Sequence, residues 1–176
     1  MNVVKDLTIG NPPDQVNVFI EVPRGSKNKY ELDKDTGLVT LDRVLYTPFV
    51  YPMDYGLIPQ THWHDGDPID VVVLNAAEPY VPGAVVPARP VGVIRMIDDG
   101  ERDEKVICVP VDSPQLAGVK DQGDITPHLL EETKYFFEHY KDLQGKKVTV
   151  EGIDSAAAAK KVIEEAVALY KKEIAG

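Results

Sequence analysis

Alternation of apolar and polar positions predicts short strands along most of the chain. Residues 16–22 alternate in this way and are rich in β-branched side chains, and residues 37–44 show a similar pattern after a turn at Thr36 and Gly37. Further strand candidates, separated by turn signals at Gly or Pro, are residues 70–74, 90–97, 105–111 and 146–153. Many short strands without intervening helices are typical of a small antiparallel β-barrel.

Helical periodicity is confined to the C-terminal part of the chain. Thr126 followed by Pro127 predicts the start of a helix, and Gly145 supplies its stop. Ser155 opens a second helix, which carries an apolar stripe opposite lysines and glutamates. The stripe is formed by Ala159, Val162, Ile163, Ala166, Leu169, Tyr170 and Ile174. The pattern therefore predicts a mainly β fold with two C-terminal helices.

Length and charge narrow the class of protein. A chain of 176 residues is expected to form a single domain, residues 1–176. Its 19 Lys and Arg against 29 Asp and Glu give a formal net charge of −10. Such a charge opposes binding to a nucleic-acid backbone or an anionic membrane, because both attract positive surfaces. We therefore expect no nucleic-acid and no membrane partner.

The cysteine content and the apolar runs indicate the cellular compartment in which the protein is expected to act. Cys108 is the single cysteine, which excludes an intrachain disulfide and a thiolate-rich zinc site and favours a reducing compartment. The N-terminus lacks the apolar segment of a signal peptide, and the longest apolar run, residues 71–74, is too short to span a bilayer. We expect a cytoplasmic protein.

Two acidic turns are the first candidates for chemistry. Asp65, Asp67 and Asp70 fall within six residues, in a turn made rigid by Gly66 and Pro68. Carboxylates so close raise each other's pKa unless a cation binds, and their hard oxygens suit Mg²⁺, Mn²⁺ or Ca²⁺. The glycine in second place does not fit a calcium-sensor loop. A second acidic group, Asp98, Asp99, Glu101, Asp103 and Glu104, would complete a site for several metal ions if the two turns meet.

Cations and phenols form a third group. Lysine and arginine bind phosphate oxygens, and tyrosine donates a neutral hydrogen bond, so together they describe a site for a highly charged phosphate compound. The group comprises Lys29, Arg43, Tyr51, Tyr55, Lys105, Tyr140 and Lys141. Simpler interpretations stay open: solvated acidic turns, surface lysines, tyrosines at the edge of the core, and Glu21 and Glu31 as outward strand residues.

The same segments resemble family I soluble inorganic pyrophosphatases of the short prokaryotic type. The signature segment is Asp65-Gly-Asp-Pro-Ile-Asp-Val71, and the family's other blocks are matched, in the same order, by residues 29–31, 41–43, 51–56, 89–92 and 136–141. The resemblance covers the chain from about residue 16 to its end. It implies an OB-like five-stranded antiparallel barrel flanked by two C-terminal helices, and a homohexamer.

The resemblance also implies roles for individual residues. Asp65, Asp70 and Asp103 would hold a first metal, Asp70 also a second, and Asp98 with Asp103 a metal that arrives with substrate. Asp67 would be the general base. Lys29 and Tyr55 would hold the electrophilic phosphate and Arg43, Tyr140 and Lys141 the leaving one, while Lys105, Glu21 and Glu31 would complete the shell around the metals and substrate.

The implied activity is hydrolysis of pyrophosphate to two phosphates. The cofactor would be several Mg²⁺ ions, with Mn²⁺ or Zn²⁺ as substitutes, and a metal-activated water would attack directly without a covalent intermediate. Two other functions stay open: an OB-fold binder of oligonucleotides, against which the net charge speaks, and a metal-dependent phosphatase of organic phosphates.

Overall fold

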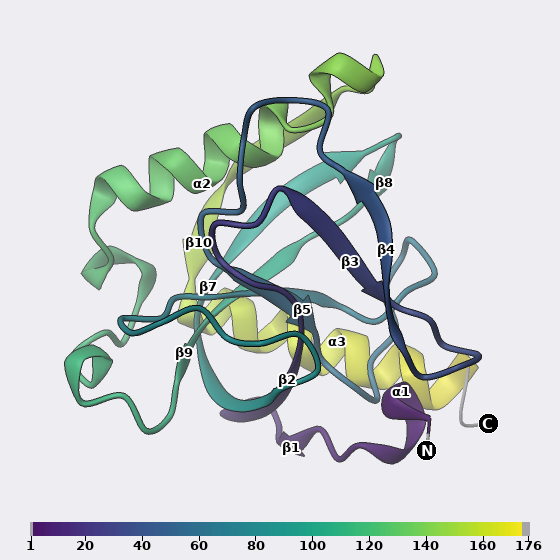
Figure 1. Cartoon of the computed structure of the whole chain (residues 1–176). Coiled ribbons are helices and arrows are strands. Elements are labelled where there is room, and N and C mark those ends of the chain that lie inside the picture. The colour runs from purple at the N-terminus through teal and green to yellow at the C-terminus, as the bar shows by residue number, and fades with distance from the viewer. Residues whose placement is uncertain (1, 174–176) are drawn as a thin grey trace.

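The computed structural model describes residues 2–173. Most of its strands precede two longer helices, and one last strand lies between these helices (Figure 1). The strands are β1 (Gly10–Asn11), β2 (Gln15–Val22), β3 (Asn28–Leu32), β4 (Val39–Val44), β5 (Asp54–Leu57), β6 (Asp70–Val73), β7 (Val85–Asp98), β8 (Glu101–Arg102), β9 (Lys105–Pro110) and β10 (Val148–Ser155). The α-helices are α1 (Val3–Asp6), α2 (Pro127–His139) and α3 (Ala156–Glu173), and short 3-10 turns lie at Pro114–Leu116, Gln122–Asp124 and Asp142–Gln144.

Five strands close into a barrel. β2 pairs with β5, β5 with β6, β6 with β9, β9 with β7, and β7 returns to β2, so that the ring has no free edge. The predicted five-stranded barrel with two C-terminal helices is therefore confirmed. The pairing between β6 and β9 is parallel rather than antiparallel, because the chain crosses the barrel through β7 between them.

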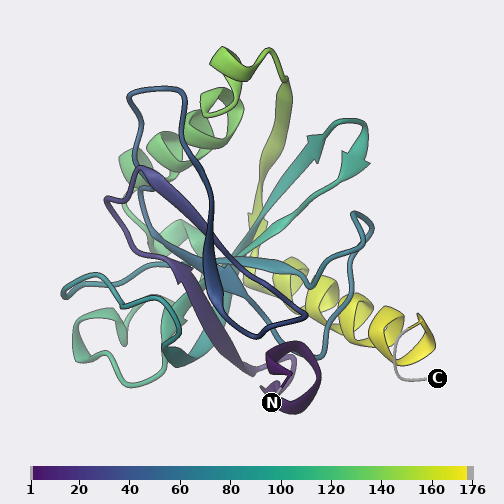
Figure 2. The same ribbon diagram turned by 45° about the vertical axis from the view of Figure 1, so that its right-hand side comes forward.

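The two longer helices cover different sides of the barrel and are joined through β10 (Figure 2). Ala159, Val162, Ile163 and Ala166 of α3 are buried against one apolar cluster of the barrel, which confirms this part of the predicted stripe. Ile174 of that stripe lies outside the described residues. Phe136 and Phe137 of α2 pack in a second cluster.

The position of β6 between two apolar clusters explains why its sequence is a continuous apolar run. Val71 and Val73 pack in the cluster beneath α3, whereas Val72 packs in the cluster beneath α2. Both faces of this strand are buried, so neither face calls for polar residues.

The first long helix starts at Pro127 as the sequence predicts, but it ends at His139, six residues before the predicted stop at Gly145. The side chain of Thr126 makes no capping hydrogen bond, and the carbonyl of Thr126 instead accepts from the N–H groups of Leu129 and Leu130. Helix α2 ends at His139, before a short 3-10 turn that stops at Gly145 with φ of 72°. Glycine adopts this left-handed conformation with the least strain because it has no Cβ atom.

Gly56 allows β2 and β5 to approach closely. It pairs with Ile20, and a Cβ atom at position 56 would lie 2.0 Å from the carbonyl oxygen of Phe19. No side chain larger than hydrogen fits there, because the obstacle is backbone that cannot rotate away. Tyr55, the residue before Gly56, pairs with Val22 of β2 and Val72 of β6.

We expect Gly56→Ala to destabilise the fold by about 3 kcal/mol or more, since the strands must separate to admit the methyl group. Gly152→Ala is the matched control, because this strand glycine has no atom within 4 Å of the added Cβ. Urea unfolding of both variants measures the difference. Equal midpoints for the two variants would show that the close approach is not rigid.

Candidate active site

Parallel pairing of β6 and β9 places Asp70 directly beside Lys105. The Lys105 ammonium donates to Asp70 Oδ2 at 2.5 Å and to Asp103 Oδ1 at 2.6 Å, and Lys105 is only 2% exposed. Burial by itself would lower the pKa of Lys105, but the charges of Asp70 and Asp103 outweigh it and raise this pKa well above its ordinary value. Lys105 is thus a permanent cation at the base of the site.

Asp65, Asp70 and Asp103 converge on one point. Each offers a carboxylate oxygen within 4.8 Å of those of the other two. The turn that presents Asp65 is closed by Gly66, which has φ of 90°, and by the N–H of Asp67, which donates to Asp65 Oδ1 at 3.1 Å. The two acidic turns of the sequence therefore do meet.

The electrostatics of this cluster favour a bound cation. Burial, with the charges of Asp70 and Asp65, raises the pKa of Asp103 to about 7 although Lys105 opposes the shift. Burial and the charge of Asp70 likewise raise the pKa of Asp65. The negative charge of these carboxylates is not fully balanced by Lys105, and a divalent cation that prefers oxygen ligands fits this set of donors.

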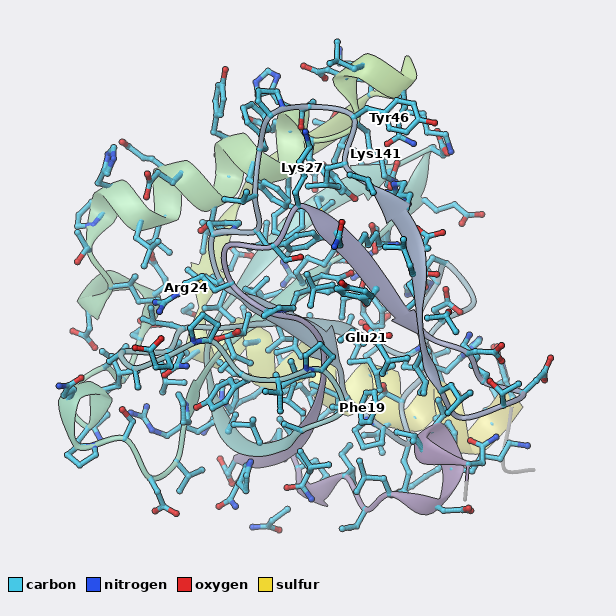
Figure 3. All side chains as sticks on the ribbon, in the orientation of Figure 1. Phe19, Glu21, Arg24, Lys27, Tyr46 and Lys141 are labelled. Atoms are coloured by element: carbon cyan, nitrogen blue, oxygen red, sulfur yellow. The ribbon has the colours of Figure 1, made fainter. Side chains whose placement is uncertain are left out.

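Asp98 and Lys141 close the site from the α2 side. Asp98 ends β7, and its Oδ2 accepts from the ammonium of Lys141, which follows the C-terminal end of α2. Asp98 Oδ1 is buried without a hydrogen-bond partner among the described residues. Figure 3 shows Lys141 toward α2 and Glu21 nearer the middle of the molecule.

Glu21 and Glu31 line the opposite wall. Glu21, from β2, is 5% exposed and its Oε1 accepts from the N–H of Leu32 at 2.7 Å. Burial, helped by the charges of Asp70 and Glu31, raises the pKa of Glu21 to about 8. Glu31, from β3, pairs with Lys29 of the same strand.

Two tyrosines supply neutral donors. Tyr55 and Tyr140 have buried rings, and burial raises the pKa of both phenols well above the ordinary value. They therefore keep their protons, and their O–H groups are available as hydrogen-bond donors in the cavity that they line. Tyr51 packs behind them, with its ring centroid 5.3 Å from that of Tyr55.

These side chains surround one cavity of about 210 Å³. Of the residues to which the family resemblance assigns roles, all but Arg43 line it; they are Glu21, Lys29, Glu31, Tyr55, Asp65, Asp67, Asp70, Asp98, Asp103, Lys105, Tyr140 and Lys141. The other candidates, Tyr51, Asp99, Glu101 and Glu104, do not line it. Arg43 lies opposite Lys29 in the backbone register of the β3–β4 hairpin, and its Nη1 donates to Asp42 Oδ2 at 2.6 Å. Its buried Nε and Nη2 have no hydrogen-bond partner among the described residues.

Lys34 is a lining residue that sequence analysis missed. It follows β3, and its ammonium pairs with Asp67 across the mouth of the cavity. No local pattern distinguishes Lys34 from any other exposed lysine. Its position depends on how the β3–β4 hairpin lies over the barrel, which spacing along the chain does not reveal.

Carboxylates, cations and phenols in this arrangement define a site for a divalent metal together with a multiply charged phosphate. The family model for inorganic pyrophosphatases matches residues 18–171. An inorganic pyrophosphatase of Picrophilus torridus is 46% identical over 162 residues, covering 92% of this chain and 91% of the relative. Soluble inorganic pyrophosphatase 2 of Chlamydomonas reinhardtii is 49% identical and covers 95% of this chain and 87% of its own.

The solved structures agree with the sequence relatives. The crystal structure of inorganic pyrophosphatase from Thermus thermophilus superposes with a TM-score of 0.93 at 43% identity, covering 97% of this chain and 99% of the other. The chain belongs to the inorganic pyrophosphatase family, and its relatives of similar length confirm the short prokaryotic type. Proteins of this family hydrolyse pyrophosphate to phosphate. Between residues 2 and 173, no helix is both long and apolar enough to cross a membrane.

The raised pKa of Glu21 predicts that the stability of the metal-free protein depends on pH. Its folded-state pKa of about 8 lies above the ordinary value of 4.5, so the folded chain keeps a proton that the unfolded chain loses between these pH values. Stability therefore falls by several kcal/mol as pH rises through this window. We expect Glu21→Gln to flatten the fall, because the amide oxygen still accepts from the N–H of Leu32 and carries no charge.

Thermal unfolding in EDTA at several pH values measures this effect. Glu151→Gln is the matched control, since Glu151 is an exposed strand glutamate. An unchanged slope in Glu21→Gln would mean that Glu21 is charged at neutral pH in the folded protein.

Proposed function

We propose that the chain is a Mg²⁺-dependent inorganic diphosphatase that hydrolyses pyrophosphate to two phosphates, acting as a single domain. The observation that carries the proposal is the convergence of Asp65, Asp70 and Asp103 beside the buried cation Lys105. Neither a structural core nor a solvated turn explains three carboxylates crowded around a cavity, where burial raises the pKa values of Asp65 and Asp103.

The carboxylates are proposed as the metal ligands. Asp65, Asp70, Asp98 and Asp103 would hold the ions, with Glu21 and Glu31 on the opposite wall, and Mn²⁺ or Zn²⁺ could substitute. When bound, Mg²⁺ supplies Lewis-acid chemistry, lowering the pKa of water and offsetting charge on phosphate oxygens. Lys105 orients Asp70 and Asp103 through the two hydrogen bonds described above.

Asp67 is proposed as the general base. Its side chain is exposed at the mouth of the cavity, where solvent reaches it. As water attacks one phosphorus, its proton passes to Asp67, the bond to the bridging oxygen breaks, and the second phosphate leaves with those electrons. Direct attack is proposed without a covalent intermediate. A phosphocysteine intermediate in particular is disfavoured, because Cys108 is buried and burial raises the pKa of its thiol.

The cations and phenols would divide the two phosphates between them. Lys29 and Tyr55 are proposed to hold the phosphate under attack. Tyr140, Lys141 and Arg43 would hold the leaving phosphate, where positive charge and O–H donors stabilise the developing anion. The buried Nε and Nη2 of Arg43, which have no hydrogen-bond partner within residues 2–173, support such a role if the side chain turns toward substrate.

The last part of the proposal concerns compartment and assembly: the protein would act in the cytoplasm as a homohexamer. The single buried cysteine suits a reducing compartment. Exposed apolar side chains at Tyr46, Val50, Tyr135 and Leu143 suit contact between copies. Mass measurement by light scattering after size exclusion tests the hexamer, and a monomer at micromolar concentration would reject it.

Phosphate release from pyrophosphate tests the function directly. We expect rapid release with Mg²⁺ and none after the metal is stripped with EDTA. Organic phosphate monoesters and a short oligonucleotide are the competing ligands, and we expect neither hydrolysis of the first nor a gel shift of the second at low salt. Faster release from the monoesters than from pyrophosphate would assign the chain to the other phosphatase class.

Asp70→Asn is expected to lower the rate at least about 100-fold while the fold survives, because an amide is a poorer metal ligand of nearly the same shape. Asp14→Asn is the matched control, since Asp14 pairs with Lys160 on the surface. Phosphate release at saturating Mg²⁺ and circular dichroism measure the two effects. Equal rates in both variants would remove Asp70 from the metal site.

Calcium is expected to inhibit. Ca²⁺ accepts more ligands at longer distances than Mg²⁺ and acidifies water less, so it should bind the carboxylates and support little hydrolysis. A titration of Ca²⁺ at fixed Mg²⁺ measures the inhibition, and excess Mg²⁺ should relieve it. Equal turnover with either ion would contradict the proposal that the metal acts by lowering the pKa of the attacking water.

A further inference from the structure

The turn that carries Asp65 and Asp67 is not part of any strand. Asp70 and Asp98 are placed by β6 and β7, and Asp103 lies between β8 and β9. Residues 58–69 form no helix or strand. Something other than the barrel's hydrogen-bond ladder must therefore fix Asp65 relative to Asp103.

Trp63 closes this turn through its backbone. Its N–H donates to the carbonyl of Asp67 at 2.7 Å, and its own carbonyl accepts from the N–H of Gly66 at 3.1 Å. The turn and Trp63 consequently move as one unit. Whatever holds the indole also holds Asp65.

A buried hydrogen bond joins Trp63 to the other acidic segment. The indole Nε1 donates to Glu104 Oε2 at 2.8 Å, and the two residues are 2% and 4% exposed. Glu104 lies between Asp103 and Lys105 and does not line the cavity, so it is available for this contact rather than for metal. The hydrogen bond connects points within two residues of Asp65 and one residue of Asp103.

Two arginines fix the remaining oxygen of Glu104. Arg102 donates from Nε and Nη2 to Glu104 Oε1 at 2.9 Å, and Arg95 Nη1 lies 3.6 Å from the same oxygen. The Arg102 guanidinium also lies 4.9 Å from the centroid of the Trp63 ring. These cations compensate the burial of the carboxylate and leave it a single orientation.

We propose that Trp63 and Glu104 are positioning residues that set the separation of Asp65 and Asp103, and thereby the affinity of the site for its divalent metal. The inference rests on the proposed function. Groups that orient metal ligands without touching the metal commonly change its affinity 10- to 100-fold when they are replaced. A merely structural role for this pair would change stability and leave metal affinity as it is.

The experiment measures Mn²⁺ binding without substrate, by electron paramagnetic resonance of the free ion. Trp63→Phe keeps a buried aromatic ring but removes the N–H, and Glu104→Gln keeps the shape but removes the charge. We expect each variant to raise the Kd for Mn²⁺ about 10-fold. The double variant should bind no more weakly than the worse single variant, because both changes break the same link.

Val162→Ala is the matched control. Val162 is buried in the same apolar cluster as Trp63, so its truncation lowers stability without touching the hydrogen bond, and its Kd for Mn²⁺ should equal that of the wild type. Unchanged Kd values in Trp63→Phe and Glu104→Gln, or effects that multiply in the double variant, would overturn the positioning role while the wild type still binds metal and hydrolyses pyrophosphate. A wild type that binds no Mn²⁺ would instead reject the proposed function, and the positioning role with it.

Discussion

The ion pairs of Lys105 with Asp70 and Asp103 are the interaction on which the site depends. Several carboxylates lie around one small cavity, and they repel one another. A buried ammonium between two of them donates to both, which offsets part of this repulsion and aims both at the same point. The parallel register of β6 and β9 places it there, so the topology of the barrel and the electrostatics of the site have one origin.

The other lysines of the cavity are also paired with carboxylates. Lys29 pairs with Glu31, Lys34 with Asp67, and Lys141 with Asp98. A divalent cation together with a phosphate ligand can replace these contacts pairwise, since the metal takes the carboxylate and the phosphate takes the lysine. When metal and phosphate bind together, each carboxylate and each lysine exchanges one oppositely charged partner for another. Joint binding is therefore favoured over binding of either ligand alone, which would leave one partner of each pair without an opposite charge.

Local sequence patterns predicted those parts of the fold in which the environment of a residue is set by the residues next to it in sequence. Alternation identified β2, and turn chemistry identified Gly66 and Gly145. Strand β5 gave no such signal, because all four residues are buried and include Asp54 and Gly56. Residue type and spacing made the acidic turns and the cation and phenol group candidates, and the family resemblance assigned their roles, whereas their convergence depends on pairing between β6 and β9. The link from Trp63 to Glu104 spans 41 positions, so no spacing rule reveals it.

Trp63 is the only tryptophan of the chain. Its indole lies against a guanidinium and a carboxylate, at the joint between the two segments that carry the candidate ligands. Emission from this fluorophore consequently reports the local arrangement of the acidic turns as well as global unfolding. The chain thus contains an intrinsic optical probe for ligand-induced rearrangement, with no added label and no second indole to obscure it.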